Sequence, residues 1–205
     1  MQGMGFISAL LLTYMEEECA FWILNSMIEK YSMEGFYLNG FPGLEKAFYI
    51  LMSIIKKHLK KVYDLLVKYQ MVPSMFASQW FITVFSVNLR YEILVRIFDV
   101  FLLEGQKILY RIAYGILKIN EGIIFFLENF LFLEKLLKTK SMEDCMNQFK
   151  HIYEHIDTED LFNFSFKLSL SKNHIDEYSK NYDIAKNLYT TKKEVKDEIY
   201  NYIRL

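Results

Sequence analysis

The 205-residue chain is poor in residues that break helices or cross-link chains, with only 2 prolines, 8 glycines and 2 cysteines. The two cysteines, Cys19 and Cys145, stand far apart and form no CxxC pair. This pattern argues against a disulfide framework and favours reduced thiols in a cytosolic protein. The formal net charge is −1, which gives no sign of the basic surface typical of nucleic-acid-binding proteins. We therefore expect no nucleic-acid partner.

The start of the chain is predicted to be neither a signal peptide nor a transmembrane segment. An uncharged, mostly apolar run extends from Phe6 to Met15, but no basic residue precedes it. Three glutamates, residues 16–18, follow where a cleavage site would be expected. The run is also shorter than the roughly 20 apolar residues that span a bilayer. It is predicted to be a buried helix.

Apolar residues are abundant, and their spacing indicates helices. Hydrophobic residues make up 53% of the chain and aromatic residues 17%, enough for one domain with a sizeable core. The apolar positions recur at steps of three and four without sustained two-residue alternation, so the fold class is predicted to be all-α. One long helix is expected from Leu44 to Tyr69, ending near Pro73, with Ser74 as the cap of the next helix. Further helices are expected over residues 76–86, 90–103, 105–119, 122–138, 142–155 and 158–168.

The long helix carries a cluster of lysines on one side, formed by Lys56, Lys57, Lys60 and Lys61. Such a cluster is typical of the solvated face of an amphipathic helix, and it could also contact acidic lipid or an acidic partner. The sequence leaves both interpretations open.

The C-terminal part is expected to differ from the rest. We predict one domain over residues 1–168, followed by a segment over residues 169–205 that consists of a polar linker and a terminal helix. The stretch "SKNHIDEYSKNYD" suggests the linker, and Thr191 with Glu194 has capping-box spacing before a thin apolar stripe.

Two short motifs could indicate chemistry, and both are weak. "HIYEH" places His151, Glu154 and His155 in the order of inverted zinc peptidases, but no further ligand is recognisable and such enzymes are much larger. Gly3 and Gly5 begin a GxGxxG pattern that fails at Ser8 and follows no strand. Neither a metal site nor a dinucleotide cofactor is predicted.

The most informative segment covers residues 72–118. By periodicity alone it predicts three amphipathic helices, with core side chains Trp80, Phe85, Ile97 and Phe101 and with Arg96 spaced to pair with Asp99. The same segment resembles the TBC domain of Rab GTPase-activating proteins, whose pattern has a proline before A-x-x-W-F-x-T-x-F, then R-I-W-D and L-x-E-G. The matching positions are Pro73, Ala77, Trp80, Phe81, Thr83, Phe85, Arg96, Ile97, Asp99, Leu103, Glu104 and Gly105. The tryptophan of R-I-W-D is Phe98 here, which keeps the bulk and loses the indole N–H.

The opening residues carry a second match to this family. Its YxQGM motif is reproduced from the glutamine onward by Gln2, Gly3 and Met4, before the same kind of apolar helix and acidic, aromatic segment. The resemblance covers residues 1 to about 140. We therefore expect a TBC-type domain that is truncated at its N-terminus, inside this motif, with the apolar side chains of Phe6, Leu10 and Trp22 left uncovered.

The resemblance implies a function. TBC domains accelerate GTP hydrolysis by Rab GTPases with an arginine from an upstream IxxDxxR motif and the glutamine of YxQGM, so Gln2 is the expected catalytic residue. Gly3, Met4, Trp80, Arg96, Asp99 and Gly105 are the expected binding or structural motif residues. The chain itself needs no cofactor, since GTP and Mg²⁺ belong to the partner GTPase. The protein is expected to be cytoplasmic, peripheral on endomembranes through a Rab-type partner.

The arginine has no counterpart in the chain. Its four arginines are Arg90, Arg96, Arg111 and Arg204, and none lies in an IxxDxxR context. Loss of such an arginine typically lowers turnover by roughly 10³- to 10⁵-fold. The fragment alone is therefore expected to be inactive. A non-catalytic TBC-like scaffold that binds a small GTPase or another trafficking protein is the alternative.

Overall fold

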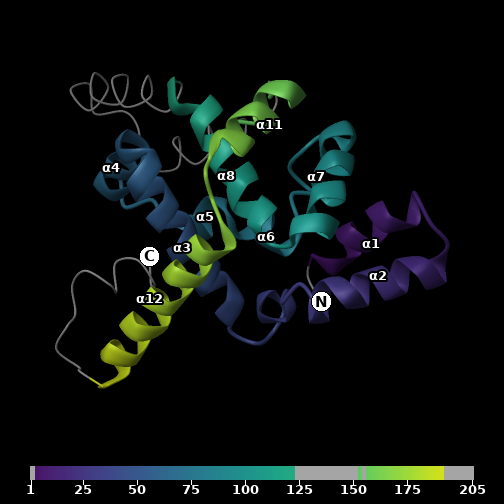
Figure 1. Ribbon diagram of the computed structural model, residues 1–205, viewed down its shortest axis with the longest axis horizontal. Helices are drawn as coiled ribbons and strands as arrows, with labels where there is room; N and C mark the ends of the chain where they lie inside the picture. Colours follow the sequence, from purple (N-terminus) through teal and green to yellow (C-terminus); the bar gives the residue numbers. More distant parts are fainter. Residues whose placement is uncertain (1–2, 123–151, 154–155, 192–205) are drawn as a thin grey trace, which may run out of the picture.

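The computed structural model describes residues 3–122, 152–153 and 156–191, and every regular element in these ranges is a helix (Figure 1). The all-α prediction is therefore confirmed for this part of the chain. None of the helices described is both long and apolar enough to cross a membrane. In chain order the elements are α1 (Met4–Leu12), α2 (Glu17–Glu29), the 3-10 turn η1 (Glu34–Phe36), α3 (Pro42–His58), α4 (Lys60–Lys68), α5 (Pro73–Phe76), α6 (Ser78–Ile82), α7 (Tyr91–Glu104), α8 (Lys107–Ile119), α11 (Thr158–Lys167) and α12 (Lys172–Thr191).

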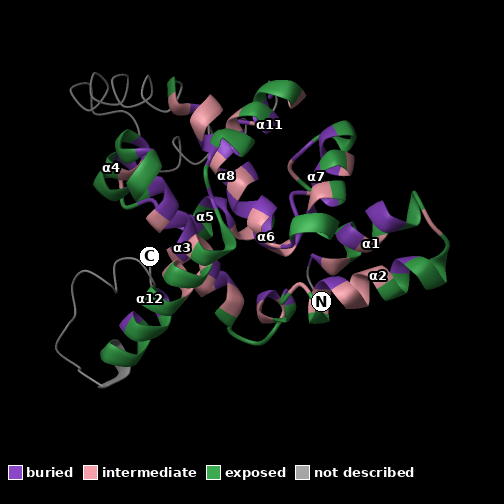
Figure 2. Ribbon diagram, in the orientation of Figure 1, coloured by how far each residue is buried: buried purple, intermediate pink, exposed green. Residues whose placement is uncertain are grey.

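Helix α8 is the centre of the molecule. It contacts α3, α6, α7 and α11, and Figure 2 shows it buried along much of its length. Ile108, Leu109, Ile112, Ala113 and Ile116 are all fully buried. Lys107, Arg111 and Lys118 lie along the other, only partly buried side of α8, so the helix is amphipathic and its wide apolar face packs against the surrounding helices.

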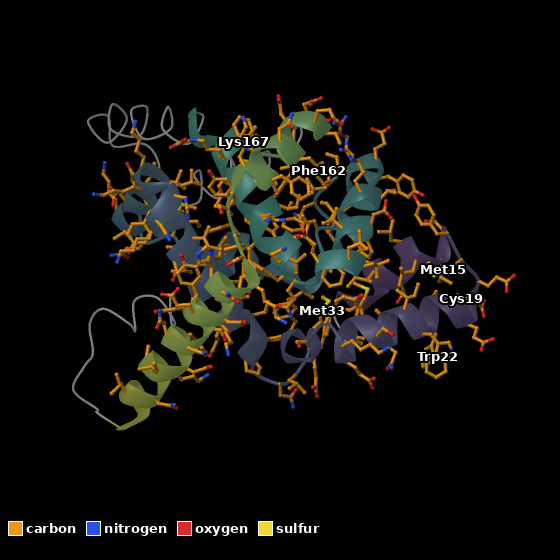
Figure 3. All side chains as sticks on the ribbon, viewed as in Figure 1. Met15, Cys19, Trp22, Met33, Phe162 and Lys167 are labelled. Carbon is orange, nitrogen blue, oxygen red and sulfur yellow. The ribbon has the colours of Figure 1, made fainter. Side chains whose placement is uncertain are left out.

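Helices α1 and α2 form an arm at one end of the molecule, packed against each other (Figure 1). Phe6 and Trp22 are more than half exposed on this arm, as the sequence led us to expect. Leu10 is buried, so the expectation of an uncovered side chain was wrong there. Trp22 projects away from the two helices (Figure 3).

Aromatic side chains from several helices meet in the core. Trp80, Phe85, Ile97 and Phe101 are all fully buried, which confirms the predicted core residues. The Trp80 ring stacks on that of Phe85 with centroids 5.7 Å apart. Its indole Nε1 donates a hydrogen bond of 2.6 Å to the hydroxyl of Tyr153.

The long helix predicted from Leu44 to Tyr69 is divided into α3 and α4. Leu59 separates them, with φ −131° and ψ 55°, although its side chain is buried. No proline or glycine marks the break, and the apolar period continues through it. Sequence pattern therefore carries no sign of the interruption. Lys56, Lys57, Lys60 and Lys61 are exposed around it.

The helix predicted over residues 76–86 was also wrong in its bounds. Two short helices, α5 and α6, occupy this region, and Ser74 lies inside α5, whose N-cap is Val72 with Pro73 at the first turn. After α6 the Phe85 N–H donates to the Trp80 carbonyl at 3.0 Å, and Val84 has φ 51°. This arrangement is a Schellman-type helix end, in which the left-handed residue is usually glycine. Because this position holds a buried valine instead of a glycine, the sequence gives no sign that the helix ends there.

The helices predicted over residues 90–103, 105–119 and 158–168 are confirmed as α7, α8 and α11 to within a few residues. At the start of α11 the side chain of Asp157 caps the helix by accepting from the Asp160 N–H at 3.0 Å. The helices expected over residues 122–138 and 142–155, and the one expected after Thr191, lie outside the described residues, apart from residues 122, 152 and 153.

The polar stretch after Ser171 is a helix, α12, so the predicted linker was wrong. Helix α12 packs on α3 and buries Tyr182 and Ala185 there. The Tyr182 hydroxyl and the Lys186 Nζ each donate to Glu45 Oε2 at 3.0 Å. Polar residues are frequent in this helix because only a narrow face is buried (Figure 2).

Helices α8 and α11 lie in close contact at Gly115. A Cβ at this position would lie 2.2 Å from Ser165 Oγ and 3.1 Å from the Leu161 carbonyl oxygen. Ser165 is fully buried, and its hydroxyl has no hydrogen-bond partner among the described residues.

This contact predicts opposite effects of two similar substitutions. Gly115→Ala is expected to lower the free energy of unfolding by about 1–3 kcal/mol through overpacking. Ser165→Ala removes an unsatisfied buried hydroxyl and should be neutral or slightly stabilising. Urea denaturation of the two variants tests this. A Ser165→Ala variant that loses as much stability as Gly115→Ala would mean that the Ser165 hydroxyl makes a hydrogen bond in solution, contrary to the described structure.

Candidate functional site

The first described residue, Gly3, fixes the start of α1. It is buried and has φ 98°, a conformation that residues with a side chain rarely adopt. A Cβ here would lie 2.1 Å from Ile82 Cγ2 and 3.2 Å from the Ile82 carbonyl oxygen. Gly3 is thus the residue that lets α1 begin directly against the end of α6. The expected catalytic residue Gln2 precedes it in sequence and lies outside the described residues.

Met4, the next motif residue, is the first residue of α1 and is half-buried. Its carbonyl oxygen accepts a hydrogen bond from Ser8 Oγ at 3.0 Å. This bond lies within α1, so the contact of Gly3 with Ile82 is what anchors the α1 end from which the chain leads back to Gln2.

Tyr37, which sequence analysis missed, binds the Ile82 carbonyl against which Gly3 lies. The Tyr37 hydroxyl donates a 2.8 Å hydrogen bond to the Ile82 carbonyl, the oxygen that Gly3 approaches. Burial raises the pKa of Tyr37 well above its ordinary value, so this phenol stays protonated and remains a donor. Tyr37 follows η1 and has no periodic neighbours, and no sequence pattern indicates its contact.

Trp80 lies away from any surface. It is fully buried and packs against Phe76, Phe85 and Tyr153. Its role in the described structure is to fill the core beneath α6.

Arg96 and Asp99 share α7 but do not pair with each other. Arg96 Nη1 donates to Glu159 Oε1 at 2.6 Å, and its guanidinium lies 4.4 Å from the centre of the Phe162 ring. The predicted Arg96–Asp99 pair was wrong, since Arg96 instead joins α7 to α11. Figure 3 labels Phe162 on α11, where it lies towards α7.

Asp99 is exposed on the side of α7 near the α1–α2 arm. The rings of Tyr14 and Tyr91 stack there with centroids 5.9 Å apart. Hydrogen bonding to Tyr91, with a smaller contribution from the Asp99 charge, raises the pKa of Tyr14 to about 12. Asp99 is thus a motif residue of α7 whose carboxylate lies at the surface close to Tyr14.

Gly105 ends α7. It has φ 67° and ψ −148°, and a Cβ would lie 3.2 Å from the Tyr31 ring. The next residue, Gln106, donates through Nε2 to the carbonyls of Tyr31 and Ser32, at 3.0 and 2.8 Å. The L-x-E-G motif thus ties the end of α7 to the turn after α2.

The arginines in the described part of the chain are all engaged within the fold. Arg90 Nη2 donates to the Ile156 carbonyl at 2.8 Å. Arg111 donates to Glu104 at 2.7 Å and, at 3.3 Å, to the carbonyl of Leu170. Together with Arg96, they hold residues 156–170 against α7 and α8. Arg204 lies outside the described residues.

No metal centre is found among the described residues, where no group of three or more potential ligands comes together. His151, Glu154 and His155 of the weak zinc motif lie outside this part of the chain. The predictions of no metal and no cofactor remain predictions.

The motif residues therefore divide into two sets. Trp80 packs in the core, and Arg96 and Gly105 join α7 to its neighbours, whereas Gly3 and Met4 form the end of α1 that leads back to Gln2. Asp99 belongs to neither set, since it is exposed on the surface of α7. The start of α1 therefore lies against the end of α6 on a scaffold of packed helices. The described residues contain no cluster of catalytic side chains within that scaffold.

A comparison with known families matches residues 1–125 to a family described as the Rab-GTPase-TBC domain. The matched region begins at the same residues that fix α1 and ends just after α8.

Several curated proteins are similar to this chain over the same region. The GTPase-activating protein GYP5 of Saccharomyces cerevisiae is 34% identical over 121 residues, which are 58% of this chain and 14% of the yeast protein. The small G protein signaling modulator 3 of Homo sapiens is 30% identical over 128 residues, 62% of this chain and 17% of the human protein. The TBC1 domain family member 4 of Mus musculus is 28% identical over 138 residues, 67% of this chain and 11% of the mouse protein. The chain thus spans less than a fifth of the length of each of these relatives.

Proposed function

The chain belongs to the Rab-GTPase-TBC domain family, and on this premise we propose that it forms the glutamine-bearing part of a domain that accelerates GTP hydrolysis by a Rab-type small GTPase. The observation that carries the proposal is the anchored start of α1. Gly3 is held against Ile82 by a contact that excludes any side chain, and Gln2 is joined to Gly3 by one peptide bond. A fixed backbone beside a glutamine is what water positioning requires.

The proposed chemistry of Gln2 follows from its amide group. The carbonyl oxygen can accept a hydrogen bond from the attacking water while the NH₂ group donates two, and neither requires a change of charge. GTP and Mg²⁺ are supplied by the GTPase, so Gln2 only has to orient the water that attacks the γ-phosphate.

The second proposed component is a positive charge that offsets the negative charge of the transferring phosphoryl group. Arg90, Arg96 and Arg111 are poor candidates, because each already binds a carboxylate or a carbonyl group within the fold. We propose that an IxxDxxR segment, which these 205 residues do not contain, supplies the arginine. The 205-residue chain alone is accordingly proposed to be inactive.

A non-catalytic scaffold remains the alternative function. The engagement of three arginines within the fold favours it if no other arginine reaches the GTPase. Both functions place the protein in the cytoplasm, peripheral on endomembranes through its GTPase partner.

We also propose that the domain extends beyond the matched region, to residue 168. Tyr153, Ile156 and Glu159 bind the side chains of Trp80, Arg90 and Arg96, respectively. Residues 169–205 would then be an appended segment that begins with the short connection to α12.

A Rab-panel hydrolysis assay tests the proposed function. The chain would be compared with a chimera in which a segment of yeast GYP5 precedes these 205 residues. This segment is the part of GYP5 that comes before the region similar to our chain. The family's IxxDxxR motif is expected in that part. The chimera should accelerate phosphate release from at least one GTP-loaded Rab by about 10³-fold or more, and the chain alone should not.

The same assay separates the two candidate functions. A chimera that binds a GTP-loaded Rab without accelerating hydrolysis would favour the scaffold. Strong acceleration by the 205-residue chain alone would contradict the need for an added arginine.

A further inference from the structure

We propose that Tyr37 is a positioning residue for Gln2, which it would influence through the Ile82 carbonyl and Gly3. This inference rests on the proposed function, because the effect of Tyr37 on rate depends on Gln2 acting in GTP hydrolysis. The hydroxyl of Tyr37 is proposed to contact neither the GTPase nor Gln2 and to act only through the backbone between them.

The Gly3 backbone lies directly on Ile82. A Cβ on Gly3 would be only 2.1 Å from Ile82 Cγ2 and 3.2 Å from the Ile82 oxygen, so no space separates the two residues. Any shift of the Ile82 main chain must therefore move the start of α1 or open a gap beneath it.

The Ile82 carbonyl lies at a helix end. Ile82 is the last residue of α6, where carbonyl groups lack the N–H of a following turn. The N–H of Ser86, which would serve it in a continuing helix, donates instead to Thr83 at 3.0 Å. Within the described residues, the donor to this carbonyl is the Tyr37 hydroxyl at 2.8 Å.

Tyr37 is partly buried and packs against the core. The preceding residue, Phe36, is buried with its ring 6.0 Å from that of Phe81 on α6. The hydroxyl of Tyr37 therefore links the turn at η1 to the end of α6, on which α1 begins. Loss of the hydroxyl leaves a partly buried carbonyl without its donor, a change that allows this helix end to shift.

The test replaces Tyr37 by phenylalanine and uses Tyr153→Phe as a matched control. Both substitutions remove one partly buried phenol hydroxyl that makes a hydrogen bond, but the bond of Tyr153 is to the indole of Trp80 and not to the Ile82 carbonyl on which Gly3 lies. In the chimera, Tyr37→Phe should lower the maximal rate of hydrolysis by about 10- to 100-fold, as expected for a small misplacement of a catalytic group. The half-saturating concentration should change little, and Tyr153→Phe should leave the maximal rate unchanged.

A second measurement does not depend on activity. In the 205-residue chain, Tyr37→Phe should accelerate amide hydrogen exchange in the second turn of α1, where the first helical hydrogen bonds protect the amides, more than Tyr153→Phe does. Gly3→Ala disturbs the contact between Gly3 and Ile82 at Gly3, whereas Tyr37→Phe disturbs it at Ile82. The effect of Gly3→Ala on this exchange should therefore not add to that of Tyr37→Phe in the double variant.

The outcomes distinguish this inference from the proposed function. If the unaltered chimera is inactive on every Rab, the proposed function fails, and faster exchange in Tyr37→Phe still supports the positioning of α1. Unchanged exchange in α1 would overturn the inference whatever the activity. An active chimera whose rate is insensitive to Tyr37→Phe would also overturn it.

Discussion

Replacing Gln2 by alanine in the chimera is expected to lower the maximal rate of Rab GTP hydrolysis by about 10²- to 10³-fold, the loss typical when one preorganised hydrogen-bonding group at a reacting centre is removed. The amide is proposed to contact the attacking water mainly in the transition state. Its loss should therefore lower the rate far more than it weakens binding of the GTP-loaded Rab. Single-turnover phosphate release, titrated with activator, gives both quantities.

Gln79→Ala is the matched control for this experiment. Gln79 is an exposed glutamine on α6, so the control removes the same side chain from a solvated position. Its maximal rate should equal that of the unaltered chimera. Equal rates for the Gln2 and Gln79 variants would show that Gln2 has no part in the chemistry.

The second large effect is expected in stability. Trp80→Ala should lower the free energy of unfolding by about 3–5 kcal/mol, because it empties the space of the largest core side chain. Trp80 is 0% exposed, and its replacement also deprives the Tyr153 hydroxyl of the hydrogen bond that the indole N–H donates.

The chain supplies its own control in its second tryptophan. Trp22 is 58% exposed on α2, so Trp22→Ala should change the free energy of unfolding by only about 0.5 kcal/mol or less. Chemical denaturation followed by circular dichroism compares the two without relying on tryptophan fluorescence. Similar losses for both variants would mean that the arm carrying Trp22 is covered in solution, contrary to the described structure.

Periodicity was sufficient to predict the helices that are strongly amphipathic and end at ordinary signals. Helix α7 ends at Gly105, where a glycine with positive φ is expected, and its predicted bounds were close. The end of α6 was missed because Val84 takes the position that glycine usually occupies. The division at Leu59 was missed because a buried leucine continues the apolar stripe across it.

Helix α12 shows a different failure. Its composition is polar, and its attachment depends on Tyr182 and on hydrogen bonds to Glu45 of α3, which is far away in the sequence. Local composition carries no information about such long-range partners. A helix that buries only one narrow face against another element is therefore easily mistaken for a linker.

Of the candidate site, only the residues that lie in family motifs could be predicted from the sequence. The resemblance identified Gly3, and the structure supplies the physical reason for a glycine there. Tyr37 carries no such signal, because its significance depends on a contact with Ile82 that only the tertiary structure brings about. Trp80 and Arg96 also belong to the family's motifs, yet Trp80 packs in the core and Arg96 forms an exposed ion pair that joins α7 to α11.

The most direct test of the proposed role of Gln2 is a crystal structure of the chimera bound to a Rab that carries GDP, Mg²⁺ and aluminium fluoride in place of the transferring phosphoryl group. We predict that the side-chain amide of Gln2 lies within about 2.6–3.2 Å of the water aligned for attack, with Gly3 resting on Ile82. A complex in which Gln2 points away from that water, or in which the Rab binds elsewhere on the packed helices, would contradict it.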